Sequence, residues 1–487
     1  MKNPFLRLKA VLPFFTFVPI FFFRLFRSLT WVELIELREW IFASKRILKN
    51  ISQSSSLAKY RSESERGQRF SELTQKKLSE MGPKGLGVIA NNEYLTGGGY
   101  RSSSIVALKK FLAYESSRGA SAILDEDLMF FGPEWASAIG HSSYLSIIPK
   151  LSFDETHSSQ RRILIYSHAA NNFYLSLFAS LYTLCKLPES LRSVLVNYLE
   201  DHLHPLDTFR INSTKVSDLY SALTQSERKW NAAMGERSFL HLPEQAFIAG
   251  QEFLKKAKLE NFEWFVALHM REAPSTPARD VGNVEVETYI PAIREVLRSG
   301  GAVIRLGNPG MTRLEKFDSA LSEDSGYFDY ANSPFKSEIL DIFLMSTCRF
   351  MIGTASGPLH VLKDFGKSVL YTNAPKVGML PGVRGYCLPI LYKNSSMEIL
   401  TLSEMLSYDE VGWRYSTLRS EFSMVKNSKE DILVATQFML EGGYRIDFQG
   451  RDDSLNDAAN KIRKPYEASS AMPICPTYLS SHAKLLV

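Results

Sequence analysis

The sequence predicts an α/β protein with two domains, each built on a parallel β-sheet. Short apolar segments of strand length alternate with longer helical segments, and this alternation is typical of parallel sheets with helical crossovers. Polar and cationic residues follow the predicted strands, and Gly/Ser turns lead into the helices after them. A chain of 487 residues is also too long for one typical domain, so two or three domains are expected.

Composition fits a globular protein and argues against several functional classes. Hydrophobic residues make up 45% of the chain and charged residues 22%, and the net charge is only +5. This mild positive charge suits an anionic ligand or an anionic membrane surface. No basic stripe with interleaved aromatic residues is present, so no nucleic-acid partner is expected. The four cysteines are widely spaced without a CxxC pair, which argues against a disulfide framework or zinc site and favours a reducing compartment.

Residues 1–50 are predicted to contact a membrane surface. The apolar run Val11–Phe23 contains two prolines and is shorter than a spanning helix requires, and basic residues flank it on both sides. No A-x-A cleavage site follows it, which argues against a removed signal peptide. Helical periodicity over Leu29–Lys49 predicts an amphipathic helix. The alternative is a Phe-rich segment that packs on the protein's own core.

The rest of the N-terminal half is divided by its composition. The polar residues within 51–83 predict a linker with some helix. The first α/β domain is expected over 84–255, with strand candidates at 85–90, 121–124 and 163–166. The apolar stretch Phe173–Leu187 is predicted as a helix, and residues 189–250 are predicted as mainly helical and connecting.

The second α/β domain is expected over 256–425. Its predicted strands are Phe265–Leu268, Ala302–Leu306, Arg349–Ile352 and Ser368–Leu370, and its predicted helices are Val286–Ser299 and Ser337–Ser346. Residues 426–487 are expected to form a helix, Lys429–Glu441, that returns to pack on the first domain. Beyond Gly450 the scattered Ser and Pro residues predict poor order.

Arg271 and Arg305 stand at the ends of two successive predicted strands of the second domain. His269 and Arg271 directly follow the first of these strands. A planar, permanently charged guanidinium suits phosphate oxygens. The alternative is a surface arginine beside a core histidine. Arg305 ends the next strand just before Gly307, where a glycine lets the backbone approach a ligand. Arg305 is either a second phosphate clamp or the partner of a salt bridge to Asp329 or Glu272.

The segment Gly353-Thr354-Ala355-Ser356-Gly357-Pro358 follows the third strand. Small residues at a strand-to-helix turn expose backbone N–H groups, which is a pattern of anion sites, and Ser356 is a candidate helix cap. A plain cap without a ligand is the alternative. The order G-x-x-S-G differs from the nucleophile elbow G-x-S-x-G, so a serine hydrolase is not predicted. Asp341, within an otherwise apolar helix, must be paired or capping.

Several pieces of the C-terminal half, in order, resemble a family of bacterial glycosyltransferases of GT-B type. The pieces are Arg271, Asn283, Tyr289–Ile293, Val303–Gly307, Asp329–Ala331, Ile339–Leu344, Cys348–Gly353 and Ser356–Pro358. The resemblance runs to about Met405, and the N-terminal half matches only weakly. The H-x-R motif is also similar to that of fucosyltransferases, in which the arginine contacts the nucleotide diphosphate.

This resemblance implies two Rossmann-like domains facing a cleft and transfer of a sugar from a nucleotide-activated donor to a glycan or lipid-linked acceptor. The implied donor-binding residues are His269, Arg271, Arg305, Gly307, Asp341, Gly353, Thr354, Ser356 and Gly357. Asp341 would lie beside the ligand or brace an arginine. The implied setting is bacterial surface polysaccharide synthesis, with the protein cytoplasmic and peripheral on the inner face of the cytoplasmic membrane.

The implied chemistry is inverting transfer without a cofactor. Arg271 would stabilise the departing diphosphate, so no divalent metal is expected, although Asp125-Glu126-Asp127 formally matches the D-x-D metal pattern of GT-A enzymes. Glu272 and His168 are the leading candidates for the base, and Asp280 and Glu93 are further ones. The alternatives are another nucleotide-sugar enzyme, such as an epimerase, and a non-catalytic, membrane-attached glycan-binding protein.

Overall fold

The computed structural model forms two compact units. It describes residues 128–153, 161–187, 192, 196, 203–204, 206, 208–210, 216–235, 237–272, 282–322, 326–375, 383–407, 422–445, 454–463 and 472–486. Of these, the N-terminal unit takes the residues within Met1–Pro133, Ser159–His168 and Ala179–Pro205, and the C-terminal unit takes those within Glu134–Ser158, Ala169–Phe178 and Leu206–Val487. The predictions for 1–50, 51–83, 85–90 and 121–124 lie outside the described residues.

The N-terminal unit holds a parallel sheet of four strands in the order β3-β2-β1-β4. The strands are β1 (Leu128–Phe131), β2 (Arg161–Tyr166), β3 (Thr183–Lys186) and β4 (Leu203–His204). Phe130 lies opposite Ile163 and Leu203, and all neighbouring pairs run parallel. The predicted strand at 163–166 is therefore confirmed as part of β2.

The predicted helix Phe173–Leu187 is wrong over most of its length. The helix α8 covers only Asn172–Ser176, and the chain then enters strand β3. A continuous apolar run fits a buried strand as well as a buried helix, so periodicity alone cannot separate them.

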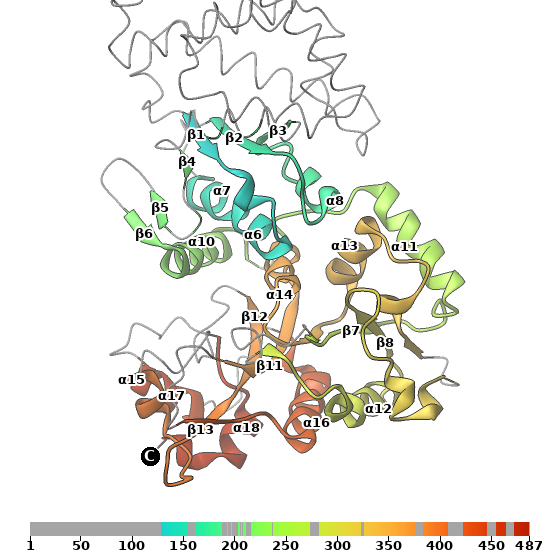
Figure 1. Ribbon diagram of the computed structural model, residues 1–487, viewed down its shortest axis with the longest axis vertical. Helices are drawn as coiled ribbons and strands as arrows, with labels where there is room; N and C mark the ends of the chain where they lie inside the picture. Colours follow the sequence, from blue (N-terminus) through green and yellow to red (C-terminus); the bar gives the residue numbers. More distant parts are fainter. Residues whose placement is uncertain are drawn as a thin grey trace, which may run out of the picture. The chain divides into compact units, whose positions relative to one another are not determined.

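The C-terminal unit contains a parallel sheet of six strands in the order β12-β11-β10-β7-β8-β9 (Figure 1). The strands are β7 (Phe265–His269), β8 (Ala302–Leu306), β9 (Tyr327–Phe328), β10 (Met351–Gly353), β11 (Ser368–Ala374) and β12 (Arg384–Pro389). All neighbouring pairs are parallel. Read along the chain, this is the strand order of the Rossmann fold, with the reversal between β7 and β10. The predicted α/β class with parallel sheets is confirmed.

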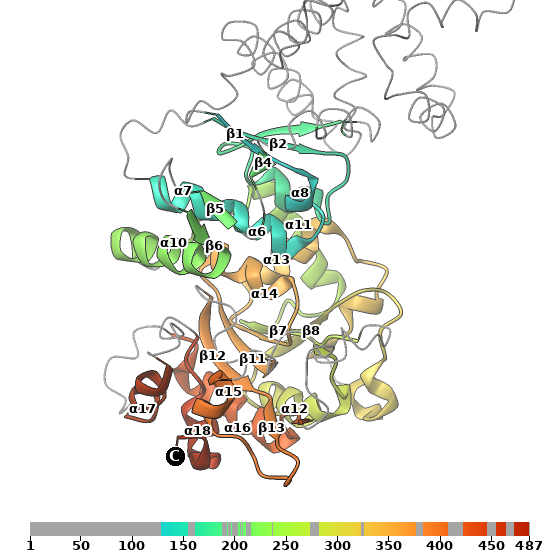
Figure 2. The ribbon, with the colours of Figure 1, turned by 60° about the vertical axis from the view of Figure 1, so that its left-hand side comes forward.

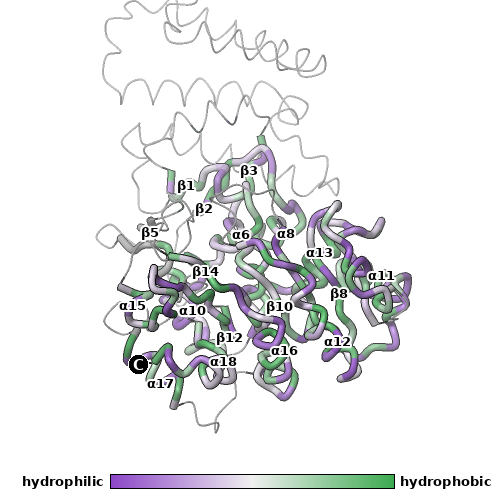
Figure 3. Tube along the Cα trace, turned by 60° about the horizontal axis from the view of Figure 1, so that its bottom comes forward, coloured by the Kyte–Doolittle hydropathy of each residue, from purple (hydrophilic) through white to green (hydrophobic). Residues whose placement is uncertain are grey.

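The central strands are buried on both faces, as parallel strands with helical crossovers require. The crossover helices are α12 (Ile290–Arg298), preceded by a 3₁₀ turn at Val286–Tyr289, and α13 (Glu338–Thr347). Ser337 caps α13 by accepting the Leu340 N–H at 3.3 Å. In Figure 3, hydrophilic and hydrophobic residues alternate along α11 (Glu244–Lys256) and α12, as expected of helices with one face on a core.

A cluster of buried charges joins several helices of the C-terminal unit. Lys150 on α7 (Ile147–Ser152) donates to Glu227 on α10 (Leu219–Met234) at 2.7 Å. Lys363 donates to Asp364 at 2.8 Å, and Asp364 also lies 3.4 Å from Lys150 and accepts from Tyr174 of α8 at 2.5 Å. Burial of two lysines is possible because the carboxylates of Glu227 and Asp364 partner them, and the Tyr174 hydroxyl donates to Asp364 in turn.

The C-terminal segment contains the predicted helix. This helix, α16 (Lys429–Phe438), packs on α12 within the C-terminal unit (Figures 1 and 2), and its packing on the first domain stays a prediction. We expected poor order beyond Gly450, but α17 (Ser454–Arg463) and α18 (Pro476–Ser481) are ordered. Ile474 forms a β-bridge with Cys387 and anchors this segment to the edge of the sheet.

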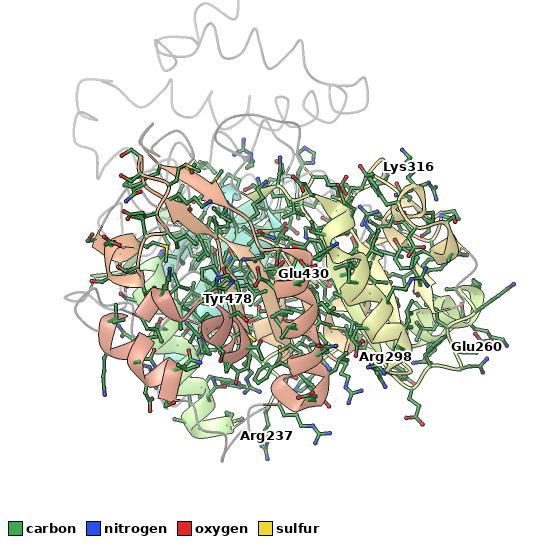
Figure 4. All side chains as sticks on the ribbon, turned by 90° about the horizontal axis from the view of Figure 1, so that it is seen from below. Arg237, Glu260, Arg298, Lys316, Glu430 and Tyr478 are labelled. Atoms are coloured by element: carbon green, nitrogen blue, oxygen red, sulfur yellow. The ribbon has the colours of Figure 1, made fainter. Side chains whose placement is uncertain are left out.

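Smaller elements complete the C-terminal unit. They are α6 (Ile139–Ser143), α14 (Pro358–Val361), α15 (Leu402–Ser407), and the antiparallel pairs β5 (Thr208–Arg210) with β6 (Val216–Asp218) and β13 (Leu391–Lys393) with β14 (Ser423–Val425). Figure 4 shows Glu260, Arg298 and Lys316 at the margin, pointing outward, whereas Tyr478 is buried among its neighbours. Within the described ranges, no helix is long and apolar enough to cross a membrane.

Candidate functional site

The candidate site lies at the carboxyl ends of β7 and β10, where the strand order reverses. Thr354, just after β10, is fully buried, and its N–H donates to the His269 carbonyl of β7 at 3.1 Å. Its hydroxyl accepts the Arg271 N–H at 2.9 Å. Ligands of open α/β sheets bind in the crevice outside such a reversal. Thr354 therefore joins the two strand ends that border this crevice.

Arg271 is held at the reversal point by main-chain groups. Its Nη1 donates to the Ala355 carbonyl in the turn after β10 at 3.1 Å. A Cβ atom on Gly282 would lie 3.1 Å from the same Nη1, so the Arg271 side chain passes close to this glycine. The Arg271 carbonyl accepts the Val284 N–H at 3.2 Å. The structure thus places a half-buried, permanently charged group at the crevice.

His269 is buried at the end of β7 and remains neutral. Burial lowers its pKa to about 4, and the nearby cations Arg305, Lys336 and Arg271 act in the same direction. Within the described part of the chain, its Nδ1 is buried without a hydrogen-bond partner. His269 is therefore unsuited to act as a second cation against a phosphate at neutral pH.

Arg305 is a structural ion pair rather than a phosphate clamp. Its side chain is fully buried, it pairs closely with Glu272, and Asp329 lies 3.8 Å away. It also donates to the Thr312 carbonyl. This is the salt bridge that the sequence left open as the alternative. The side chain ends inside the unit because both carboxylates compensate its charge there.

Glu272 is occupied by the same network. One carboxylate oxygen accepts from Arg305 and the other accepts the Thr312 N–H at 3.0 Å. A general base must reach the acceptor hydroxyl with a lone pair. Both oxygens of Glu272 accept a hydrogen bond within the unit, which supports a structural role, and its role as the base stays a prediction.

Gly307 and Asp341 also have structural explanations. A Cβ atom on Gly307 would lie 2.3 Å from the Met311 sulfur, so the glycine allows its own loop to close. Asp341 pairs with Lys336 at 2.8 Å, half-buried in the first turn of α13. It is therefore paired, as predicted, but its partner is a lysine and not an arginine.

The turn Gly353–Gly357 packs closely against the helix α6. A Cβ atom on Gly357 would lie 3.0 Å from the Gly140 N atom, and one on Gly353 would lie 2.8 Å from Leu359. Ser356 was expected to cap the following helix, but the N-cap of α14 is Gly357, without a side-chain hydrogen bond. At least part of the small-residue pattern therefore reflects close packing.

The other candidates for chemistry are placed elsewhere or not described. His168 follows β2 in the N-terminal unit and is exposed. Glu93, Asp280 and the run Asp125–Asp127 lie outside the described residues. In the part that the structure describes, no three His, Cys, Asp or Glu side chains gather as metal ligands would. The expectation of a metal-independent reaction remains a prediction.

Sequence reasoning missed a buried polar network beside the site. The Thr372 hydroxyl lies 2.6 Å from the Tyr289 hydroxyl and 3.2 Å from the Gly353 carbonyl. The Asn373 amide donates to Tyr289 at 3.2 Å, and its own backbone has φ of 50°, a conformation that Asn tolerates. Asn427, in the C-terminal segment, forms two hydrogen bonds with Asn373. The sequence Asn373-Ala374-Pro375 indicates a turn at this position, but it does not show that Asn373 contacts Tyr289 and Asn427, which are distant along the chain.

Comparison with known proteins gives weak likenesses of fold. No family model matches the chain, and no curated protein matches it. Among solved structures, ADP-heptose LPS heptosyltransferase II of E. coli gives a TM-score of 0.36 at 12% identity, with 64% of this chain and 98% of that chain covered. E. coli heptosyltransferase WaaC with ADP gives 0.34 at 11% identity, with 66% and 99% covered.

A glycosyl transferase of family 9 from Veillonella parvula gives a TM-score of 0.30 at 14% identity, with 62% of this chain and 79% of that chain covered. At such scores these likenesses carry no argument about ligand or activity. What this chain binds must be inferred from its own residues.

Proposed function

We propose that the chain is a glycosyltransferase that takes a sugar from a nucleotide-activated donor. The carrying observation is that Arg271 is held at the carboxyl ends of β7 and β10 by the Thr354 hydroxyl and the Ala355 carbonyl. Sugar transfer leaves a nucleotide diphosphate whose negative charge grows in the transition state. A guanidinium that is positioned beforehand stabilises this charge without reorganising.

The choice of sugar transfer rests on the resemblance described under Sequence analysis. Its pieces coincide with the elements around the crevice: Arg271 follows β7, Cys348–Gly353 contains β10, and Ser356–Pro358 leads into α14. A Rossmann sheet by itself serves many activities, so it supports a nucleotide ligand but not a reaction. The resemblance supplies the reaction class.

The finer features of the proposal concern the acceptor and the setting. The acceptor is a glycan or a lipid-linked sugar, and transfer is inverting and independent of metal. Of the candidate bases that the structure describes, His168 keeps an exposed side chain at the carboxyl end of a parallel strand. Bacterial surface polysaccharide synthesis at the inner face of the cytoplasmic membrane fits a basic, apolar N-terminal segment.

The test is a binding panel without metal. Calorimetry with GDP, UDP, CMP, ADP and dTDP is run on the full chain, on Arg271→Ala and on the control Arg298→Ala. The control removes the same charge from an exposed position on α12. A charged hydrogen bond contributes about 1.5–3 kcal/mol, so Arg271→Ala should weaken binding of the preferred nucleotide by roughly 10–100-fold. Arg298→Ala should bind like the wild type.

Other outcomes separate the alternatives. No binding of any nucleotide, with or without Mg²⁺ or Mn²⁺, would contradict the proposal and favour a non-catalytic glycan-binding protein. Conversion of the free nucleotide sugar to an isomer without an acceptor would favour the epimerase-like alternative. Equal binding by Arg271→Ala and wild type would remove Arg271 from the site.

A further inference from the structure

An exposed lysine from the C-terminal segment lies next to the segment that covers Arg271. Lys426 directly follows β14, and its Nζ donates to the Asn283 carbonyl at 2.7 Å. An ammonium has three donors, and a neutral carbonyl occupies one of them without compensating the charge. Among the residues that the structure describes, no carboxylate forms a salt bridge with Lys426.

The contacts lead from Lys426 to Arg271 in two steps. Asn283 follows Gly282, at which a Cβ atom would lie 3.1 Å from the Arg271 Nη1. Val284, on the other side of Asn283, donates its N–H to the Arg271 carbonyl at 3.2 Å. The short segment 282–284 therefore touches Arg271 at both ends and Lys426 in its middle.

The backbone next to Lys426 is fixed firmly. Asn427 is 4% exposed and exchanges two hydrogen bonds with Asn373, whose side chain accepts the Asn427 N–H at 2.8 Å. The Asn427 amide also donates to the Pro389 carbonyl at 3.0 Å. Asn373 and Pro389 lie at the carboxyl ends of β11 and β12. Lys426 is thus held at the same edge of the sheet as the crevice, by residues that tolerate little displacement.

We infer that Lys426 is a second cation of the donor site and binds the diphosphate together with Arg271. The inference rests on the proposed function. A nucleoside diphosphate carries two to three negative charges at neutral pH, so one cation leaves it undercompensated. Lysine acts as a compact point charge on a flexible stem, which lets it turn from the Asn283 carbonyl to a phosphate oxygen. The sequence offered no sign of this role, because Lys426 is distant from every motif.

The rival explanation is that Lys426 only ties segment 282–284 to the C-terminal part. Two substitutions separate the explanations. Lys426→Gln keeps an N–H donor for the Asn283 carbonyl but removes the charge, and Lys426→Arg keeps the charge. Lys429→Gln is the matched control, because Lys429 is exposed at the start of α16 and pairs only with its neighbour Glu430 among the described residues, at 3.8 Å.

The experiment measures affinity for the nucleoside diphosphate selected by the panel and for its monophosphate, at low and moderate salt. Lys426→Gln is expected to weaken diphosphate binding about tenfold and monophosphate binding less, and to reduce the salt dependence of diphosphate binding. Lys426→Arg should stay within about threefold of wild type, as should Lys429→Gln. Melting temperatures are recorded for all variants.

The results also separate this inference from the proposed function. If Lys426→Gln binds the diphosphate like wild type while Arg271→Ala does not, the inference fails and the proposed function stands. If Lys426→Gln and Lys426→Arg lose affinity equally and melt earlier, Lys426 is a structural tie and the inference is overturned. If wild type binds no nucleotide, the proposed function fails and the inference falls with it.

Discussion

The substitution Glu272→Gln tests whether this carboxylate is a structural partner or a base. Arg305 is fully buried, with Glu272 as its near carboxylate and Asp329 at 3.8 Å as its far one. Glutamine keeps the shape and one acceptor oxygen of Glu272 but not its charge. The variant therefore leaves a buried guanidinium with only the more distant carboxylate.

The size of the effect follows from this geometry. Removing one partner of a buried ion pair costs about 3–5 kcal/mol. Asp329 retains part of the attraction and 18% of the Glu272 side chain is exposed, so we expect the variant to lose about 2–3 kcal/mol. For a large unit this corresponds to a fall of roughly 4–10 °C in Tm.

The assay is thermal and urea unfolding of wild type, Glu272→Gln, Arg305→Met and the double variant. The double variant should be more stable than the sum of the single changes predicts, because neither Arg305 nor Glu272 is then left as a charge without its near partner. Asp329 loses its more distant cation in this variant but keeps its hydrogen bonds from Asn332. Glu252→Gln is the control, since it removes a carboxylate from an exposed pair with Lys256 and should change stability by less than about 0.5 kcal/mol. A Glu272→Gln protein that melts like wild type but no longer releases diphosphate from its donor would refute this reasoning and support Glu272 as a base.

Two further predictions concern buried groups of the C-terminal unit. The His269 pKa of about 4 lies below its ordinary 6.5, so the unfolded chain binds the proton first and stability is lost as pH falls from 6.5 towards 4. His269→Asn should therefore reduce the loss of unfolding free energy between pH 7 and pH 5 by about 2 kcal/mol in urea titrations, and an unchanged loss would contradict the lowered pKa. Gly250→Ala would normally favour a helix by about 1 kcal/mol, but its Cβ would lie 2.2 Å from the Phe343 ring, so we expect a net loss of about 1–3 kcal/mol. Adding Phe343→Leu should recover part of this loss in the same unfolding assay, and a Gly250→Ala protein more stable than wild type would show that the ring moves freely.

The sequence carried enough local information to predict four of the six strands of the second sheet, and it missed β9 and β12. The bounds of β8, Ala302–Leu306, were predicted as the structure has them, because a strand buried on both faces is a short apolar run between polar turns. The position of Arg271 at a strand end was predictable for the same reason. Local patterns failed where they are ambiguous, as at β3, where an apolar run was taken for a helix.

Only the tertiary structure decided which partner each charged side chain meets. Arg271 and Arg305 both end or follow a parallel strand, and no local pattern distinguishes them. Arg305 pairs with Glu272, 33 residues away, and Arg271 donates to a main-chain carbonyl 84 residues away. Lys426 meets Asn283 across 143 residues of sequence, and Lys150 meets Asp364 across 214. Periodicity depends on neighbours along the chain, but pairing of charges depends on neighbours in space. The sequence by itself therefore determined most strands of the sheet, and the fold determined the site.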